Sequence, residues 1–320
     1  MNRSLLLSAG IGLTIAMPAW TQTFPAKPIR IVVAYAAGGP NDLMARSIAP
    51  TLSARLGQNV IVDNRPGAGS NIGSAYVAKS ARDGHTLLLG SPANAINPAL
   101  YASMPYDPLK ELAPVTLLAV NPYLLVAHPS LPVRSVRELI ALAKSRPGEV
   151  TFASSGAGGA SHLTGELLKV TAKIDILHVP YKGGGPALVD LAGGRVSIMF
   201  DNMITAVPYV KSGRLRALGV TSLTRSEVVP DVPTVHESAL PKFESLGWFG
   251  IFAPAGTPPE TVTSLNQALV AIVREAQFVE RLRTQGATVV GSSPAEFDRF
   301  FRADAAKWAP VVQASGARAD

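Results

Sequence analysis

The chain has 320 residues, a length typical of two domains, and 47% of the residues are apolar while 16% are charged, a composition that excludes an intrinsically disordered protein. It carries 29 basic and 22 acidic residues, and because the basic ones are scattered and not interleaved with aromatic residues, a nucleic-acid-binding protein is not expected. There is no cysteine, so disulfides and a lipoprotein anchor are excluded.

The first 21 residues have the organisation of a secretory signal peptide. Arg3 precedes an apolar run from Leu5 to Met17, and small residues follow around Ala19. The run is short for a membrane span, although an uncleaved N-terminal anchor is the alternative. We expect cleavage near residues 19–22 and a soluble periplasmic protein with 28 basic and 22 acidic side chains.

Strand-like and helical segments alternate in the first third of the chain. Residues 29–35 are predicted to form a strand, and Met44, Ile48, Leu52 and Leu56 follow at helical i, i+4 spacing. Strands at 59–62 and 85–89 enclose a helix at 71–80. This alternation predicts an α/β unit whose parallel sheet has helices on both faces.

A second α/β unit is predicted further along, after a loop-rich stretch at 97–114. It begins with an apolar strand at 122–126 and a helix that Ser135 and Glu138 start as a capping box. Its remaining elements are strands at 150–154, 175–181, 196–201 and 215–220 and helices at 161–172 and 187–191.

The C-terminal part is predicted to contain a strand at 247–254 and two helices. The two helices are predicted to start after Thr257 and Ser293, because each of these residues is followed by Pro at the first helical position and Glu at the third. If the strand returns to the first unit, the helices pack there, and two crossovers link the units as a hinge.

Four glycine-rich junctions lie where a predicted strand runs into a helix, at 36–42, 66–73, 90–97 and 154–162. Open α/β sheets bind ligands at such junctions because the N–H groups at a helix N-terminus lack partners and carry partial positive charge. The four loops contain one acid, Asp42, and no lysine or arginine. They are interpreted as a backbone site for a small carboxylate; the alternative is that the glycines only permit tight turns.

Other functions have weaker support. Residues 67–73 resemble a dinucleotide fingerprint but lack the later acid, and no glycine run precedes a Gly-Lys-Ser/Thr sequence. An exported α/β hydrolase would use Ser154 or Ser155 with His162, although no serine lies in a Gly-x-Ser-x-Gly motif. The five histidines have no metal-binding spacing, so no metal is expected.

Two single residues are open to two interpretations, and a third is interpreted as structural. Asp201, at the end of an apolar strand, is either a ligand-binding group or a helix N-cap. Lys182, in the turn YKGGGP, either approaches a ligand carboxylate or is a solvated turn lysine. His178, on an apolar strand, is interpreted as a hydrogen-bonded core residue.

Long motifs in one order resemble a known family, the periplasmic substrate-binding receptors of tripartite tricarboxylate transporters, or Bug-type receptors. The resemblance begins with FPAKPIRIVVAYAAGGPNDLMARSIAPTLSARLGQNVIVDNRPGAGSNIGSAYVAKSARDGHTLLLG and continues with TFASSGAGGASHLTGELLK, HVPYKGGGPALVDLAGGRVSIMFD and FGIFAPAGTPPE. It covers nearly the whole mature chain.

The resemblance implies an α/β, two-lobed type II periplasmic-binding-protein fold, two α/β domains joined by two crossover segments. One domain would comprise residues 22–122 and 248–320 and the other 123–247, after the signal peptide 1–21. The cleft would close over a small carboxylated metabolite, a di- or tricarboxylate, an amino acid or an aromatic acid, for a transporter or a sensor. The protein would be a monomer, with possible membrane transporter subunits as partners, and no enzyme, cofactor or metal is implied.

Carried onto this chain, the ligand contacts would come from both lobes, partly through water. The residues are Tyr35, Ala37, Gly39, Pro40, Asn41, Asp42, Ser91, Asn94, Ser154, Ser155, Gly158, Ser161, His162 and Asp201. The family commonly has Phe at position 35 and Thr or Ser at position 41. Tyr35 and Asn41 add hydrogen-bonding groups, which favours a more polar ligand.

Overall fold

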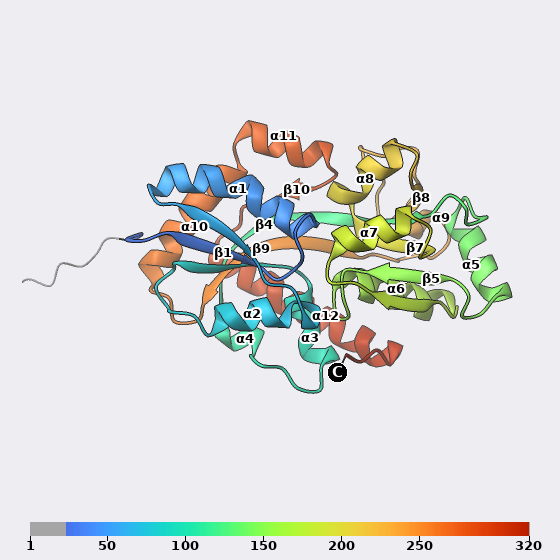
Figure 1. The fold of residues 1–320 in the computed structure, drawn as a ribbon, viewed down its shortest axis with the longest axis horizontal. Helices are drawn as coiled ribbons and strands as arrows, with labels where there is room; N and C mark the ends of the chain where they lie inside the picture. The colour runs from blue at the N-terminus through green and yellow to red at the C-terminus, as the bar shows by residue number, and fades with distance from the viewer. Residues whose placement is uncertain (1–23, 320) are drawn as a thin grey trace, which may run out of the picture.

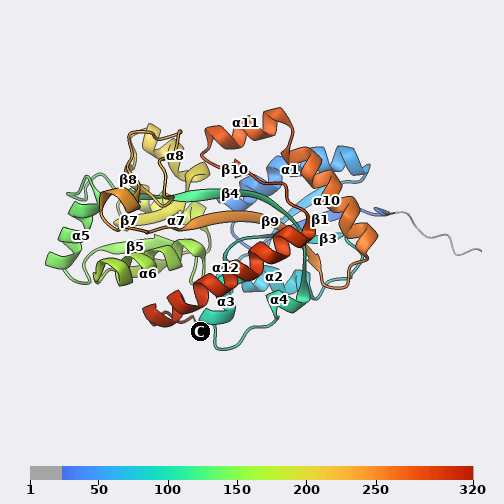
Figure 2. The ribbon, with the colours of Figure 1, turned by 180° about the vertical axis from the view of Figure 1, so that it is seen from behind.

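The protein has three layers, a single mixed sheet of ten strands between two layers of helices (Figures 1 and 2). A computed structural model describes residues 24–319, so the predicted signal peptide lies outside the described residues. The strand order is β2-β1-β3-β9-β4-β7-β5-β6, and β8 and β10 pair with β4 beside this path.

The first half of the sheet is built from β1 (Ile29–Val33), β2 (Val60–Asn64) and β3 (Thr86–Gly90), with β1 parallel to both neighbours. Helices make the connections between these strands, as the alternating sequence pattern predicts. They are α1 (Pro40–Leu56) after β1, the short 3-10 helix η1 (Ala68–Ser70) with α2 (Asn71–Ala78) after β2, and α3 (Ala93–Leu100) and α4 (Pro108–Glu111) after β3.

The second half of the sheet has β5 (Thr151–Ser154) parallel to β6 (Leu177–Pro180) and β7 (Ile198–Asn202), and β8 (Arg216–Val220) lies antiparallel to β4. Its helices are α5 (Val136–Ser145), α6 (Ala160–Ala172), α7 (Gly184–Ala192), α8 (Met203–Lys211) and α9 (Val235–Ser238).

Two long strands join the halves. The strand β4 (Leu112–Ala127) and the strand β9 (Leu246–Pro254) run antiparallel side by side, and their pairing ends at Pro122 with Leu246. Before that point β4 lies in the first half, where β9 also pairs with β3; beyond it β4 pairs with β7 and β8. The predicted return of residues 247–254 to the first unit is therefore confirmed.

Alternation along each strand sends successive side chains to opposite layers. Ile31 packs against α1, α10 and α11, while its neighbour Val32 packs against α2, α3 and α12. In the second half, Leu124 faces α7 and α8 and Leu125 faces α5 and α6. The sheet thus has a buried apolar core on each face.

Three helices follow β9, together with the short strand β10 (Thr288–Val289). They are α10 (Pro259–Val273), α11 (Ala276–Thr284) and α12 (Pro294–Ser315). Ser293 and Glu296 form the predicted capping box at the start of α12. Phe301 packs in the first half, whereas Trp308 packs in the cluster of Phe152 in the second half, so α12 spans both (Figure 2).

Several predictions about elements were wrong. The stretch 97–114 is not mainly loop, because it holds the second half of α3, all of α4 and the start of β4. A third C-terminal helix, α11, lies between the two predicted ones, and α10 starts at Pro259, so Glu260 is its second residue. The sheet is mixed, since β4 and β9 run antiparallel to their neighbours.

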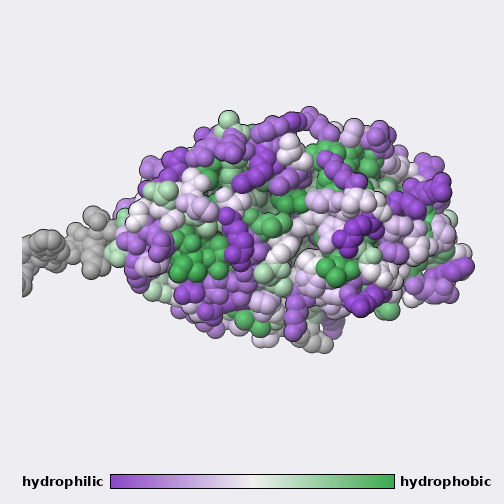
Figure 3. Space-filling view, turned by 45° about the horizontal axis from the view of Figure 1, so that its top comes forward, coloured by the Kyte–Doolittle hydropathy of each residue, from purple (hydrophilic) through white to green (hydrophobic). Residues whose placement is uncertain are grey.

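The surface is mostly polar, and Figure 3 shows the apolar residues of one face as small separate groups between polar ones. Within residues 24–319, no helix has both the length and the apolar composition needed to cross a bilayer. In the same range, no group of three or more His, Cys, Asp or Glu side chains is placed to hold a metal ion.

Candidate functional site

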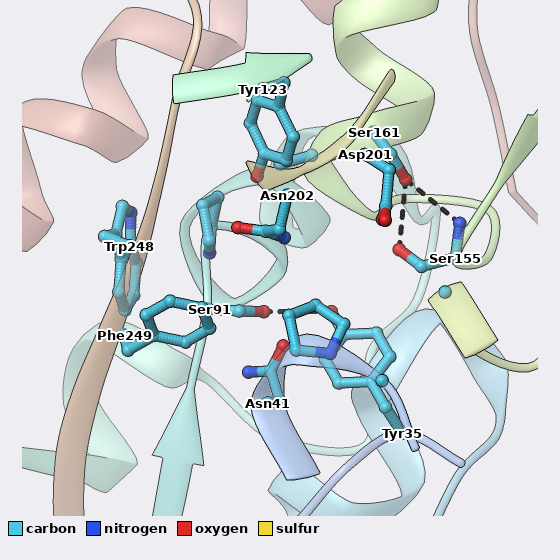
Figure 4. Close-up of a pocket in the computed structure, with 15 residues that line it drawn as sticks. Tyr35, Asn41, Ser91, Tyr123, Ser155, Ser161, Asp201, Asn202, Trp248 and Phe249 are labelled. Carbon is cyan, nitrogen blue, oxygen red and sulfur yellow. Dashed lines mark hydrogen bonds between the residues drawn. The ribbon is translucent and has the colours of Figure 1, made fainter. Parts of the chain in front are cut away.

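A small cavity of about 30 Å³ lies where the two halves of the sheet meet (Figure 4). Figure 4 shows Tyr35 and Asn41 on one side of it, Ser161 and Asp201 on another, and Trp248 with Phe249 on a third. The lining residues are Tyr35, Gly39, Pro40, Asn41, Ser91, Pro92, Tyr123, Ser155, Ala160, Ser161, Gly184, Asp201, Asn202, Trp248 and Phe249.

Five helices begin at this cavity. The lining includes Pro40 at the first position of α1, Pro92 before α3, Ala160 at the first position of α6, Gly184 at the first position of α7 and Asn202 before α8. Each helix N-terminus presents N–H groups without helical partners and a partial positive charge. Their convergence makes the cavity electrostatically suited to an anion.

Asn41 adds a side-chain donor. The residue is 7% exposed, and its Nδ2 atom makes no hydrogen bond within the described part of the chain. A buried amide N–H without a partner is costly, and a ligand acceptor in the cavity would satisfy it. Among residues 24–319, no lysine or arginine lines the cavity, so anion recognition falls to amide, hydroxyl and backbone groups.

Tyr35 and Ser91 join two of the sequence-predicted loops. The Tyr35 hydroxyl lies 2.9 Å from Ser91 Oγ, and burial raises the pKa of the phenol. Asn94 lies behind them, accepting from the Ser91 backbone N–H at 3.0 Å and donating to Ser74 Oγ. Asn94 therefore positions Ser91 without lining the cavity.

The opposite wall is formed by hydroxyls and one acid. Ser155 and Ser161 share a hydrogen bond of 3.0 Å between their Oγ atoms. Asp201 is 2% exposed and accepts from Thr205 Oγ1. Burial raises the pKa of Asp201 to about 7, so this carboxyl is partly protonated near neutral pH. The N-cap of α8 is Asn202, so the N-cap interpretation of Asp201 was wrong.

Asn202 connects the cavity to the crossing strands. Its Oδ1 atom accepts from Asn121 Nδ2 of β4, one residue before the end of the β4 and β9 pairing. On β9, Gly247 lies close to Tyr123, because a Cβ atom there would be 2.8 Å from the phenol oxygen. The junction of the two halves is thus part of the cavity wall.

The halves contact each other directly around the cavity. The Ala36 N–H donates to the Lys182 carbonyl at 3.2 Å, and the Tyr101 hydroxyl donates to the Ala157 carbonyl at 3.4 Å. Gly39 faces Gly184 so closely that a Cβ atom on Gly39 would be 3.7 Å from its nitrogen. These contacts describe a closed cleft.

The structure places eight of the fourteen sequence-predicted residues on the cavity and six elsewhere. The eight are Tyr35, Gly39, Pro40, Asn41, Ser91, Ser155, Ser161 and Asp201. The six behind or beside it are Ala37, Asp42, Asn94, Ser154, Gly158 and His162. Ala37 is exposed. The Asp42 carboxylate accepts hydrogen bonds from Arg46 and from the Gly38 N–H. Burial alone would raise the pKa of Asp42, but these two donors hold it below the usual range.

The serine-histidine pair of the hydrolase alternative is not formed, so that interpretation is not supported. His162 Nδ1 accepts from the Gly158 N–H at 3.2 Å and its ring stacks on His178 at 3.9 Å. The fully buried Ser154 pairs with His178 Nε2 at 2.6 Å, and the hydroxyl of Ser155 bonds to Ser161. Burial lowers the pKa of His162 to about 4, so it is neutral.

Seven lining residues were not predicted from the sequence: Pro92, Tyr123, Ala160, Gly184, Asn202, Trp248 and Phe249. Tyr123, Trp248 and Phe249 lie in apolar strands and have the pattern of core residues. Pro92 and Ala160 lie inside two of the four predicted glycine-rich junctions and Gly184 lies in the turn YKGGGP, so the helix N-terminus argument could have selected them.

The fold and this interdomain cavity define a two-lobed periplasmic binding protein. Residues 44–317 match the model of the tripartite tricarboxylate transporter family receptor, and the chain belongs to this family. It is 41% identical to protein BugT of Bordetella pertussis over 99% of both chains.

Solved structures agree with this assignment. The structure titled "R. palustris Rpa4515 with adipate" has a TM-score of 0.89 and 39% identity, covering 92% of this chain and 98% of its own. The structure of MatC from Rhodopseudomonas palustris with bound malate has a TM-score of 0.87 and 35% identity, covering 90% of this chain and all of its own. Both similar proteins bind a dicarboxylate.

Proposed function

We propose that this protein is a non-enzymatic periplasmic receptor that captures a small organic acid in the cleft and presents it to membrane transporter subunits. Its support is the convergence of five helix N-termini on a cavity that holds the unpartnered Asn41 amide and, among the residues described, no cationic side chain. The adipate and malate bound by the two similar proteins point to the same ligand class.

The ligand binds by closure of two lobes, one formed by residues 22–122 with 248–320 and the other by residues 123–247. The lobes move by bending of β4 and β9 at the junction of the two halves. The cavity of about 30 Å³ has room for about two water molecules, so a ligand enters only when the lobes separate. Contacts from both sides then favour the closed state by their differential affinity. The mature receptor acts as a monomer, exported by its N-terminal signal.

A thermal-shift screen tests the proposal. The mature protein is unfolded and refolded to remove bound ligand, then heated with amino acids, aromatic acids and di- and tricarboxylates. A ligand at 100 times its Kd stabilises the folded state by about 2.7 kcal/mol, which raises Tm by a few degrees. Absence of a shift with every acid would contradict the proposed ligand class.

Asn41→Ala provides the site-specific test. Loss of one buried hydrogen bond to a carboxylate should weaken binding by about 2 kcal/mol and reduce the Tm shift accordingly. Asn59→Ala, at an exposed asparagine of the first half, is the control and should leave the shift unchanged. An Asn41→Ala variant that binds as tightly as the wild type would place the ligand elsewhere.

A further inference from the structure

The two halves of the protein also meet beside the sheet, where α8 and α11 lie next to each other (Figures 1 and 2). The helix α8 belongs to the second half, and Asn202, the residue before it, lines the ligand cavity. The helix α11 and the following strand β10 belong to the first half, because β10 pairs with Ala119 and Val120 of β4. The first turn of α8 therefore has the ligand cavity at its start and the other half of the protein at its side.

Ile204, the second residue of α8, is buried by the opposite half. It is 7% exposed and lies in the apolar cluster that contains Met44 of α1 and Leu282 of α11. The neighbouring Met203 and Val207 lie instead in a cluster of their own half. Separation of the lobes would transfer the Ile204 side chain from its cluster to water, which costs free energy in proportion to the apolar area exposed.

Gly286, between α11 and β10, leaves room for Met203. A Cβ atom on Gly286 would lie 2.8 Å from Met203 Sδ and 3.2 Å from Met203 Cβ. Met203 is fully buried, so its side chain has little space into which it could turn away. A methyl group at position 286 would therefore collide with α8 when the lobes are closed.

An ion pair crosses the same boundary. Arg283 Nη1 of α11 lies 2.9 Å from Glu227 Oε2, in the loop that follows β8. The two side chains are 56% and 78% exposed, so water screens the pair and it contributes little by itself. The apolar contact of Ile204 is accordingly the main attraction between these elements, and the ion pair is a minor one at its edge.

We propose that this contact, formed by Met203, Ile204, Glu227, Arg283 and Gly286 and called the α8–α11 contact below, stabilises the closed state and thereby sets the affinity for the ligand. None of these five residues lines the cavity. The inference rests on the lobe closure of the proposed function. A contact that exists only between closed lobes raises the population of the closed state, and the apparent affinity of the ligand rises with that population.

Ile204→Ala tests the proposal in a calorimetric titration of the mature receptor with adipate. The variant should bind adipate at least about tenfold more weakly, because the closed state loses most of an apolar contact between the lobes. The matched control is Val207→Ala, at a buried residue of the same helix that packs within the second half. It should lower the free energy of unfolding and leave the Kd for adipate unchanged.

Gly286→Ala tests the contact from its other side. Gly286 has a φ of +75°, so the variant combines backbone strain with the collision against Met203. Gly57→Ala, in the first half, has a similar φ of +66° with open space around it and carries the strain alone. Gly286→Ala should weaken adipate binding and Gly57→Ala should not, although both lower the free energy of unfolding.

A measurement without ligand keeps this test apart from that of the proposed function. The chain has no cysteine, so Lys79→Cys and Lys211→Cys, at one exposed lysine of each half, can carry spin labels whose separation pulsed electron paramagnetic resonance reports. Adding Ile204→Ala should increase the share of long distances. Unchanged distances together with an unchanged Kd for adipate would overturn the α8–α11 contact. Failure of every acid to bind the wild type would overturn the proposed function, while longer distances in Ile204→Ala would still support the contact.

Discussion

Asn97 and Gly158 touch across the closed cleft: a Cβ atom on Gly158 would lie 2.3 Å from Asn97 Oδ1. Gly158 also has a φ of +84°, which other residues rarely adopt. Gly158→Ala should therefore weaken ligand binding by at least about tenfold, because closure brings the new methyl group against Asn97. Calorimetric titration with adipate, or with the best acid of the screen, measures the change in Kd.

Two further variants separate collision from backbone strain. Gly213→Ala carries a similar φ of +72° with open space around it, so it should lower the free energy of unfolding by about 1 kcal/mol and leave Kd unchanged. Adding Asn97→Ala to Gly158→Ala should restore part of the affinity. Lack of any recovery would show that the collision does not control closure.

Asp201 should make stability depend on pH. Burial raises its pKa from 3.8 to about 7, so the folded protein binds this proton more tightly than the unfolded chain. The contribution of Asp201 to stability is therefore most favourable below about pH 4 and declines as the pH rises through about 7, with a slope of up to about 1.4 kcal/mol per unit. Urea unfolding of the wild type and Asp201→Asn at pH 5 and pH 8 should show the variant gaining on the wild type at the higher pH.

The same residue should couple ligand binding to protons. Tyr35, Tyr123 and Asp201 are the titratable residues of the cavity lining, and burial keeps both phenols neutral. A bound carboxylate disfavours the charged form of Asp201, so Kd should rise between pH 6 and pH 8.5 in the wild type and stay nearly flat in Asp201→Asn. The opposite slope would indicate a ligand that offers a cationic group to Asp201.

Tyr35→Phe tests the role of the Tyr35 hydroxyl in the cavity wall. The variant removes the 2.9 Å bond between the phenol and Ser91 Oγ, which should lower the free energy of unfolding by about 1 kcal/mol. It should also favour less polar acids in a competition assay. Ser91→Ala breaks the same pair from its other side, so equal stability losses for both single variants and the double variant are expected. Additive losses would mean that the hydroxyls act independently.

His178 should limit stability in acid. Burial, His162 and Lys169 lower its pKa to about 3 from 6.5, so the folded state holds it neutral and its contribution is complete above pH 6.5 and declines as the pH falls toward 3. His178→Gln should lose stability at pH 7, where Ser154 loses its partner, and lose less at pH 4.5. Denaturant midpoints measure this, with His128→Gln, at a half-buried histidine outside this cluster, as control. If the stability difference between His178→Gln and the wild type grew as the pH fell, His178 would not be a buried neutral histidine.

Local sequence signals predicted most of the fold, and they failed where tertiary contacts override them. The apolar run at 122–126 was predicted as a separate strand, yet β4 begins at Leu112 and continues through Pro122 with Leu246 opposite. The Asn97-Pro98 pair suggested a loop, but Pro98 lies inside α3. Asn41 lies in a glycine-rich helix start and Tyr35 was implied by the family resemblance, whereas Trp248 lies in an apolar strand and lines the cavity because β9 passes beside it.

The C-terminal helix α12 packs against both halves and so braces the two strands, β4 and β9, that join them. Its Asp304 carboxylate accepts from Trp248 Nε1 on β9 at 2.8 Å and from Trp308 Nε1 at 3.0 Å, and Trp308 is packed in the second half. Two strands alone would permit a free swing of one lobe against the other. Because α12 packs against both halves, we expect opening of the cleft to displace Trp308 within its apolar cluster, which would limit how far β4 and β9 can bend.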